Sequence, residues 1–412
     1  MTTQSLQFET SAGQSFELLK NPLANAGAPW TDEQDAVLSD AALELARRSI
    51  TAWPGYAATA LVALPGQAAA LGISSLHYKD ESSRFGLGSF KALGGAYAVL
   101  RLLQREIAAR TGGAEPTTEA ILAGEFDQIV SQITVCCATD GNHGRSVAWG
   151  AQTFGCQCVI FIHSTVSEGR REAIESFDAK VVRTPGNYDD CVREADKAAR
   201  QNGWYVVSDT SYPGYVEIPK DVMQGYELMV LEALEQLPEP PTHVFIQTGV
   251  GGVAAAVAAY LTRRFGAKRP AMILADPQRS ACWLESLRAG EPTAVTGDLD
   301  TMMAGLACGE ISLLAWTILR EHADAVIAIP DSGVASAMQA LARPQAGDPP
   351  IVAGESAVAG LVALTMAANV PQAREQLGLD ASARVLVFGT EGDTDPELYQ
   401  QLVGVSGAEV RR

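Results

Sequence analysis

The sequence predicts an α/β protein with an open parallel sheet and two domains. Short runs rich in Val and Ile alternate with segments of helical periodicity along most of the 412 residues. These runs are apolar without the polar alternation of a half-exposed strand, which is typical of parallel strands buried on both faces. The length is also sufficient for two domains.

The expected elements follow in a regular order after an irregular start. The first thirty residues show no clear periodicity, and a helix is then expected from Thr31, which forms a capping box with Gln34, to about Ile50. A second helix is expected over residues 89–110, before the break at Thr111-Gly-Gly113. Strands are expected, with helices between them, at residues 133–138, 158–162, 179–183, 205–208, 243–247, 272–275, 325–329 and 384–388.

Composition and charge narrow the classes of function. Hydrophobic residues make up 47% of the chain and charged residues 19%, as expected for a globular protein with a large core. The formal net charge of −18 disfavours nucleic acid or an anionic membrane as a partner. The first residues lack the features of a secretion signal, and the longest apolar stretch, 253–261, is too short to span a bilayer. A cytoplasmic location is therefore expected.

The cysteines predict neither a disulfide framework nor a metal site. Their number, seven, is odd, and their spacing is not paired. Cys156 and Cys158 would need histidine partners that the five scattered histidines do not supply. Whether Cys282 and Cys308 pair stays open at this point.

Lys91 stands at the boundary between a glycine-containing loop and a helix. Gly86 and Gly88 precede it, and Leu93 and Tyr97 begin the helical spacing that follows. An amine at a helix N-terminus faces the positive end of the helix dipole, which favours its neutral form. A neutral lysine amine can form a Schiff base with a carbonyl; the alternative is an ordinary solvated lysine in the first helical turn.

Residues 139–144, Thr-Asp-Gly-Asn-His-Gly, follow a predicted strand and open a helix. Asp140 and Asn142 are good helix caps, so a purely structural N-cap is one interpretation. The other is an anion cradle, in which backbone amides bind a carboxylate and Asn142 donates from its side chain. His143 is expected to be structural rather than catalytic.

A glycine-rich turn, Thr-Gly-Val-Gly-Gly-Val-Ala at residues 248–254, follows the strand expected at 243–247. Its backbone amides can converge on a phosphate at the next helix N-terminus. The pattern also matches the dinucleotide fingerprint, with Asp276 after the next strand, so an NAD-dependent oxidoreductase is one alternative. The same turn fits the single phosphate of pyridoxal phosphate equally well.

Two further strands end in polar residues. Gly389-Thr-Glu-Gly-Asp393 follows the strand at 384–388 and suits a capped turn, although Thr390 would also be placed to bond a ring nitrogen. Asp209 follows the strand at 205–208. Ligands of open parallel sheets bind beyond the carboxyl ends of strands, so these loops are candidates for a site.

In this order, these stretches resemble the fold type II pyridoxal-phosphate enzymes, the family of tryptophan synthase β and the serine and threonine dehydratases. The sequence is most similar to the ammonia-lyases of this family that act on 2,3-diaminopropionate, over roughly residues 61–399. The segments that carry this similarity are 79–82, 84–87, 139–145, 187–190, 223–226, 303–310, 354–356 and 390–395. Departures are Gly88-Ser89 in place of Asn-Ala, Thr59-Ala-Leu61 in place of Thr-Pro-Leu, and additional sequence at 111–125.

The resemblance implies pyridoxal phosphate as the cofactor and an active site between two domains. The large domain would comprise residues 1–85 and 218–412, and the small α/β domain residues 86–217. The implied cofactor-binding residues are Lys91, Asn142, Gly249, Val250, Gly251, Gly252, Val253 and Thr390. The candidate substrate-binding residues are Thr139, Gly141, His143, Tyr188 and Glu355, and no metal is expected.

Three residues are the expected catalytic groups: Lys91, Asp140 and Asp209. Lys91 would serve as acid and base on its own face of the cofactor, and Asp140 as a base on the opposite face. Asp209 is a second acid and would also suit the distal ammonium of the substrate. Thr390, as a neutral partner of the ring nitrogen, makes the cofactor a weaker electron sink, which favours elimination over transamination.

The expected reaction eliminates ammonia from D- or L-2,3-diaminopropionate and gives pyruvate and two ammonia. Elimination from a hydroxy amino acid, as in the serine and threonine dehydratases, is the first alternative. A transferase of the cysteine-synthase kind and the NAD-dependent oxidoreductase are the others. A small amino acid is the expected partner, without nucleic acid or membrane, and the resemblance implies a homodimer.

Overall fold

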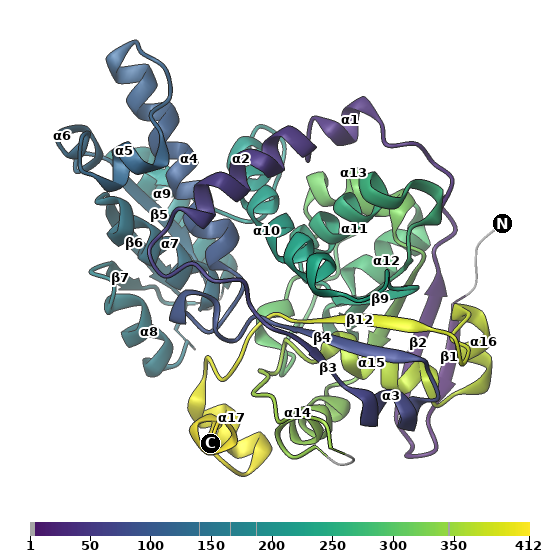
Figure 1. Cartoon of the computed structure of the whole chain (residues 1–412). Helices are drawn as coiled ribbons and strands as arrows, with labels where there is room; N and C mark the ends of the chain where they lie inside the picture. The colour runs from purple at the N-terminus through teal and green to yellow at the C-terminus, as the bar shows by residue number, and fades with distance from the viewer. Residues whose placement is uncertain (1–4, 140, 165, 187, 345–346) are drawn as a thin grey trace. The chain divides into compact units, whose positions relative to one another are not determined.

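The computed structural model describes residues 5–139, 141–164, 166–186, 188–344 and 347–412, without the side chains of residues 188 and 189. The chain forms two compact units. The first comprises residues 1–38, 58–83 and 229–412, and the second residues 39–57 and 84–228. Their elements are labelled in Figure 1. The domain bounds expected at 85/86 and 217/218 stay a prediction, and residues 39–57 group here with the second unit.

The first unit is built on an eight-stranded sheet in the order β1-β2-β11-β10-β9-β12-β4-β3. Its strands are β1 Leu6–Glu9, β2 Ser15–Lys20, β3 Leu61–Ala63, β4 Ser75–Asp80, β9 His243–Gln247, β10 Ala271–Pro277, β11 Ala325–Ile329 and β12 Arg384–Gly389. The strands from β11 to β4 are parallel, but β2, β1 and β3 pair antiparallel at the two edges. The expectation of a parallel sheet therefore holds for the centre and is wrong for the edges.

Helices cover both faces of this sheet. The helices of the unit are α1 Asp32–Asp35, α3 Pro65–Leu71, α11 Gly252–Phe265, α12 Cys282–Ala289, α13 Leu313–His322, α14 Val334–Ala342, α15 Ala359–Ala368, α16 Pro371–Leu377, α17 Pro396–Val403 and α18 Gly407–Val410. In Figure 1, α11 and α13 lie on one side of the strands, and α14 and α15 lie on the other. The central strands β9 and β11 are buried at every residue, as their apolar sequences require.

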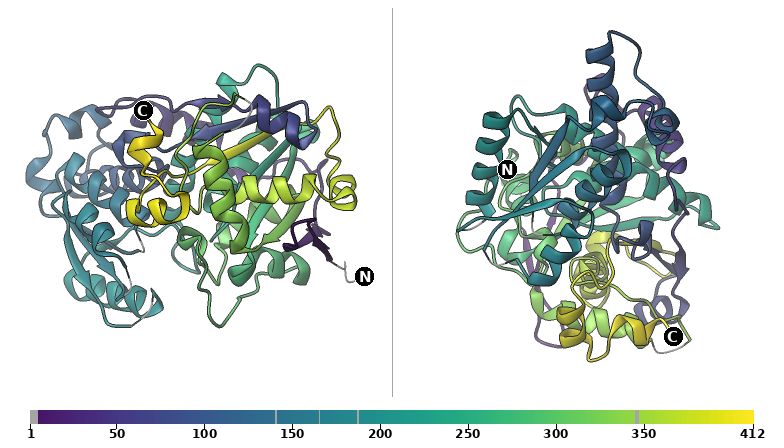
Figure 2. Two further views of the ribbon diagram at one scale, coloured as in Figure 1. Left: turned by 90° about the horizontal axis from the view of Figure 1, so that it is seen from below. Right: turned by 90° about the vertical axis from the view of Figure 1, so that its left-hand side faces the viewer.

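The second unit contains a four-stranded parallel sheet in the order β7-β6-β5-β8. The strands are β5 Thr134–Ala138, β6 Gln157–Ile162, β7 Lys180–Arg183 and β8 Tyr205–Val206. The helices are α2 Asp40–Thr51, α4 Ala92–Thr111, α5 Thr118–Leu122, α6 Asp127–Val130, α7 Asn142–Phe154, α8 Glu168–Glu175, α9 Tyr188–Asn202 and the first part of α10 Glu217–Gln236. The sheet is seen most clearly in the right-hand view of Figure 2.

The structure corrects two expectations at the N-terminus. The first thirty residues are not irregular, because they contain the β1–β2 hairpin, which pairs through β2 with β11. The helix expected from Thr31 to Ile50 is broken into α1 and α2, because Ser39 caps a new helix through the amide of Ala42. Every other strand expected from the sequence is present within a few residues of its bounds.

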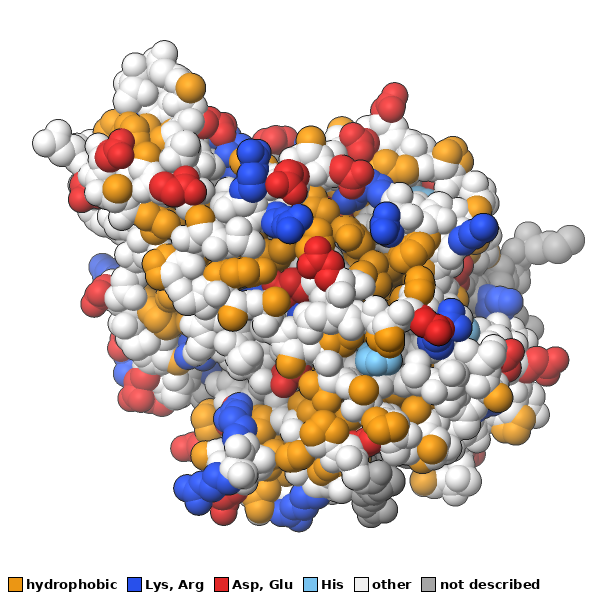
Figure 3. All heavy atoms as spheres, in the orientation of Figure 1, with side chains coloured by type: hydrophobic (Ala, Val, Ile, Leu, Met, Phe, Trp, Pro, Cys, Tyr) orange, Lys and Arg blue, Asp and Glu red, His pale blue; other side chains and the backbone are white. Residues whose placement is uncertain are grey.

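Surface charge and helix hydropathy add two observations. On the face shown in Figure 3, acidic and basic side chains intermingle. Among the described residues, no helix is both long and apolar enough to span a bilayer.

Candidate active site

In the second unit, Lys91 lies where the sequence predicts it, directly before the first residue of α4. The loop that leads to it turns through Gly86 and Gly88, whose φ angles of +72° and +76° favour glycine. The Nζ atom of Lys91 lies 2.6 Å from Oδ2 of Asp209. This ion pair stabilises the ammonium form, so the neutral amine expected from the helix dipole alone is not the form that these surroundings favour.

Asp209 enters the site from the loop after β8, and its side chain is 18% exposed. Burial alone would raise the pKa of this carboxyl. The Lys91 ammonium and the His143 ring outweigh burial and hold the pKa well below its usual range. Asp209 is therefore a carboxylate at neutral pH.

His143, on α7, contacts the same pair. Its Nε2 lies 2.8 Å from the carbonyl oxygen of Val207, and a carbonyl only accepts, so Nε2 carries the proton of the neutral ring. Its Nδ1 lies 3.9 Å from Oδ2 of Asp209 and has no hydrogen-bond partner among the described residues. Burial lowers the pKa of His143, so the ring is neutral and Nδ1 is an available acceptor. The bond to Val207 supports the expected structural role.

The other members of the 139–144 loop divide between the helix cap and the undescribed part of the chain. Thr139 Oγ1 accepts from the amides of Gly141 and Gly144, at 3.1 and 3.0 Å, so this side chain shapes the start of α7. Asn142 is the first residue of α7. Asp140, the expected opposite-face base, lies outside the described residues, as does the side chain of Tyr188.

Two aromatic rings flank Lys91. Its Nζ lies 5.4 Å from the ring centroid of Phe90 and 5.9 Å from that of Tyr226 on α10. The two rings contact each other at a centroid distance of 4.6 Å. Aromatic faces attract an ammonium, so the rings add to the effect of Asp209. The sequence showed the Met223–Tyr226 motif only as part of the resemblance and did not assign Tyr226 to the site.

Glycines allow α4, the helix that follows Lys91, to pack closely against two neighbouring helices. A Cβ at Gly225 of α10 would lie 1.8 Å from the carbonyl oxygen of Leu93, and one at Gly94 would lie 2.4 Å from the Tyr226 ring. A Cβ at Gly150 of α7 would lie 2.7 Å from Cα of Ala96. No larger residue fits these crossings without moving a helix, so they fix the position of Lys91.

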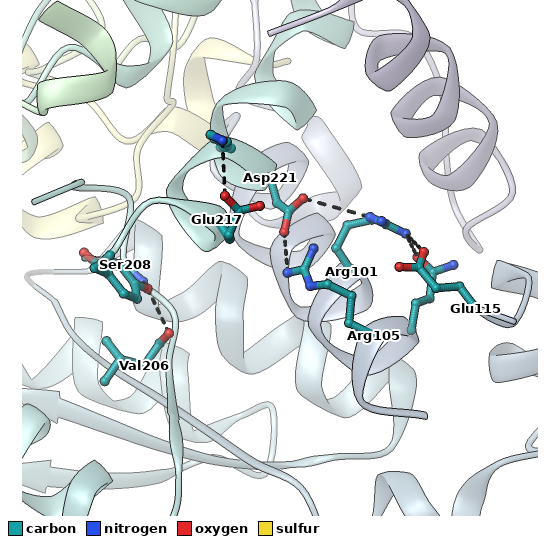
Figure 4. Close-up of polar contacts among 10 residues, drawn as sticks. Arg101, Arg105, Glu115, Val206, Ser208, Glu217 and Asp221 are labelled. Atoms are coloured by element: carbon teal, nitrogen blue, oxygen red, sulfur yellow. Dashed lines mark hydrogen bonds and ion pairs between the residues drawn. The ribbon is translucent and has the colours of Figure 1, made fainter. Parts of the chain in front are cut away.

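Ion pairs reinforce the contact between α4 and α10, as Figure 4 shows. Arg105 Nη2 lies 2.6 Å from Asp221 on α10, and Arg101 Nε lies 3.9 Å from the other oxygen of the same carboxyl. Arg101 also pairs at 2.6 Å with Glu115, in the additional sequence at 111–125. That segment is thereby held against α4.

In the first unit, the glycine turn after β9 has the geometry of a phosphate cradle. Gly251 has a φ of +97°, and a Cβ there would lie 2.2 Å from the Trp283 ring. The Trp283 indole donates to the carbonyl of Gly249 at 3.1 Å. No side chain caps the N-terminus of α11, whose first residue is Gly252. The amides of the turn and the helix start are thus left for an anion, which fits a bound phosphate.

Asp276, behind this turn, is engaged by the chain itself. It is fully buried at the end of β10 and accepts from the Thr248 hydroxyl and from the amides of Trp283 and Leu284, at 2.9 and 3.0 Å. Burial raises the pKa of this carboxyl to about 7, against the opposing effect of these bonds. A fully buried carboxyl has no access to a ribose, so this geometry disfavours the dinucleotide interpretation.

Three further residues complete the account of the first unit. Thr390 follows β12 and is 4% exposed, and its Oγ1 lies 2.6 Å from Nε2 of Gln247 at the end of β9. The sequence did not single out Gln247. Glu355 is 3% exposed. Cys282 and Cys308 are both free thiols, and both lie close to Gly249.

Comparisons with known proteins identify the family. A family model described as pyridoxal-phosphate dependent enzyme matches residues 52–391. The curated diaminopropionate ammonia-lyase of Escherichia coli K12 is 40% identical over 382 residues, which cover 91% of this chain and 94% of the relative. That of Salmonella typhimurium is 39% identical over 360 residues, with coverages of 85% and 89%. The chain belongs to the diaminopropionate ammonia-lyase family.

Solved structures of this ammonia-lyase family agree. The holo diaminopropionate ammonia-lyase of E. coli superposes with a TM-score of 0.86 at 37% identity, covering 97% of this chain and 98% of that chain. The same E. coli enzyme has been solved in complex with D-serine and with an aminoacrylate-PLP azomethine reaction intermediate, with TM-scores of 0.86 and 0.84. The predicted family, fold type II architecture and pyridoxal-phosphate dependence are confirmed, and the NAD-dependent alternative is wrong.

Proposed function

We propose that the protein eliminates ammonia from 2,3-diaminopropionate, with pyridoxal phosphate, to give pyruvate and two ammonia. The observation that carries the proposal is the 2.6 Å pair of Lys91 and Asp209 at the start of α4. The relatives of this name and the E. coli complexes support the substrate class.

The residues present suit the cofactor. The uncapped start of α11 and the turn at Gly249–Gly252 would hold its phosphate, together with Val250 and Val253 of the same segment. Thr390 would bond its ring nitrogen, Asn142 its phenolic oxygen, and Lys91 its aldehyde carbon. When bound, pyridoxal phosphate withdraws electron density from the α-carbon of an amino acid, which acidifies the α-proton and allows a β-substituent to leave.

Lys91 is the proposed acid and base on its own face of the substrate. Asp209 holds the amine in place and stabilises its protonated form, so the amine can return a proton to the leaving β-nitrogen. The expelled group must leave as neutral ammonia, so it has to be protonated as its bond to carbon breaks. We assign to Asp140 the base on the opposite face, which would allow both enantiomers to react.

Asp209 also favours a diamine over a hydroxy amino acid. Its carboxylate is neutralised by the Lys91 ammonium, and engagement of that amine by the cofactor would remove this charge from a site where Asp209 is mostly buried. A substrate with a second ammonium restores the charge balance, whereas serine brings a neutral hydroxyl. Serine is therefore the second, poorer candidate substrate, and the D-serine complex of the E. coli enzyme keeps it in consideration.

The first test is chemical. Borohydride reduction of the holoenzyme should attach the cofactor irreversibly to the peptide that contains Lys91, and Lys91→Ala should retain no reducible chromophore. Mass spectrometry of the reduced protein reads the result. Labelling at another lysine, or the absence of a chromophore in wild-type protein supplied with pyridoxal phosphate, would contradict the proposal.

The second test separates substrates and faces. Asp209→Asn should raise KM for diaminopropionate far more than for D-serine, because the amide carries no charge for the distal ammonium. Asp140→Asn should abolish turnover of one enantiomer and spare the other. Asp196→Asn, an exposed aspartate that pairs with Arg200 on α9, is the matched control and should change neither. Equal effects of Asp209→Asn on both substrates would contradict the assigned role.

Thr139, Gly141, His143, Tyr188 and Glu355 remain our candidates for substrate contact. We also propose a homodimer, on the strength of the family, and a cytoplasmic location. Light scattering of the purified holoenzyme tests the oligomer: a monomer mass would refute it.

A further inference from the structure

Gln247 and Thr390 form a buried hydrogen bond at one edge of the eight-stranded sheet. Gln247 is the last residue of β9, and Thr390 follows β12, which pairs parallel with β9. Their side chains therefore meet at the carboxyl ends of neighbouring strands, the edge from which the 249–252 turn also emerges. Gln247 is 1% exposed and Thr390 4% exposed, and the Nε2–Oγ1 distance is 2.6 Å.

Backbone carbonyls fix the orientation of the Gln247 amide. Its Nε2 lies 3.0 Å from the carbonyl oxygen of Phe388 and 3.4 Å from that of Ala357. A carbonyl only accepts, so the amide group that faces Phe388 must be the NH₂. The amide oxygen has no hydrogen-bond partner among the described residues and lies toward Gly360, where a Cβ would be 3.5 Å away. Exchanging nitrogen and oxygen would place an oxygen against the Phe388 carbonyl.

The direction of the bond to Thr390 follows from this orientation. Gln247 donates and Thr390 Oγ1 accepts. The hydroxyl hydrogen of Thr390 is not used in this bond, and no described residue accepts it. Thr390 is thus left as a hydrogen-bond donor to whatever ring atom lies before it.

We propose that Gln247 is a positioning residue that makes Thr390 a donor to the ring nitrogen of the cofactor and thereby keeps that nitrogen unprotonated. The inference rests on the proposed function, in which Thr390 faces that nitrogen. A ring nitrogen that accepts a hydrogen bond cannot itself carry the proton, whereas a protonated nitrogen needs an acceptor such as a carboxylate. Gln247 removes the acceptor option, because its amide occupies the Thr390 oxygen.

The test is nitrogen NMR of holoenzyme reconstituted with cofactor labelled with ¹⁵N in the ring. Wild-type protein should show the resonance of an unprotonated pyridine across the neutral pH range. In Gln247→Glu, an oxygen replaces the nitrogen beside Thr390 and accepts its hydroxyl hydrogen, so Oγ1 can accept from the ring. The resonance should then move toward that of a protonated pyridine, and a larger fraction of turnovers should end in transamination.

Two further variants keep the test decisive. Gln247→Met removes the donor without supplying an acceptor, so the ring nitrogen should become titratable at neutral pH even if Gln247→Glu does not fold. Gln34→Glu is the matched control, since Gln34 is also 1% exposed and also donates to a backbone carbonyl, that of Thr317. It should leave the resonance unchanged.

The outcomes separate this inference from the proposed function. A protonated nitrogen in wild-type holoenzyme, or an unshifted resonance in both Gln247 variants, would overturn the role of Gln247 while leaving the lyase proposal intact. Failure of borohydride to attach the cofactor at Lys91 would instead overturn the proposed function itself.

Discussion

Gly225→Ala should displace Lys91 although it lies outside the site. A Cβ at residue 225 would be 1.8 Å from the carbonyl oxygen of Leu93, and ordinary contact begins at 3.4 Å, so α4 and α10 must separate by about 1.6 Å, the difference of the two. Both atoms belong to rigid backbone or its first side-chain carbon, so no rotamer change relieves the clash. Leu93 is two residues from Lys91, and the amine must move with it.

The expected magnitudes follow from this displacement. Overpacking costs about 1–3 kcal/mol, and replacing a helical glycine by alanine returns about 1 kcal/mol, so stability should fall by no more than about 2 kcal/mol. Activity should fall much further, because a misplacement of about 1 Å at a reacting group costs about 10²-fold in rate. Steady-state kcat for pyruvate release and urea unfolding measure the two quantities.

Gly169→Ala provides the control. Gly169 lies in α8, with no atom within 4 Å of the position of an added Cβ. The substitution should stabilise the protein by up to about 1 kcal/mol and leave kcat unchanged. If Gly225→Ala keeps both wild-type kcat and wild-type stability, the helix crossing does not position Lys91.

Three other substitutions test the packing around the two halves of the proposed chemistry. Lys79→Met removes the buried ammonium that lies 2.9 Å from Glu232 and should cost about 3–5 kcal/mol in urea unfolding, part of which Glu232→Gln in the same chain should restore. Trp283→Phe deletes the bond to the Gly249 carbonyl and should weaken cofactor binding by about 0.5–1.5 kcal/mol, measured by titrating apoenzyme with pyridoxal phosphate; unchanged affinity would show that the turn needs no such support. Asp276 has a pKa raised to about 7, above its unfolded value of 3.8, so the folded protein loses stability as pH rises from about 4 to 7, by at most about 1.4 kcal/mol per unit. Asp276→Asn should flatten that slope, and parallel wild-type and variant curves would contradict it.

The sequence predicted those parts of the site that local chemistry specifies. Lys91 follows a loop whose glycines have positive φ angles, and the turn at 249–252 needs glycine where Trp283 approaches. Such positions are legible because each residue type answers a constraint within a few residues of itself. The same holds for the apolar central strands, whose burial on both faces leaves no polar alternation.

The remaining parts depend on contacts between distant segments. Gln247 and Thr390 are 143 residues apart, and nothing near either one announces a bond between them. The tight approach at Gly225 depends on Leu93 in another helix. The edge strands β1 and β3 are three or four residues long, too short for a periodicity to be recognised. The charged state of Lys91 was misjudged because Asp209 is distant in the chain.

The chemical duties are divided between the two units. The residues assigned to phosphate and ring nitrogen, together with Gln247, Trp283 and Asp276 behind them, all belong to the first unit. Lys91, Asp209, His143 and Tyr226 all belong to the second. The electronic character of the reagent and the traffic of protons can therefore diverge independently in evolution: a mutation in one unit would retune how strongly electrons are drawn, and a mutation in the other would alter which leaving group is accommodated.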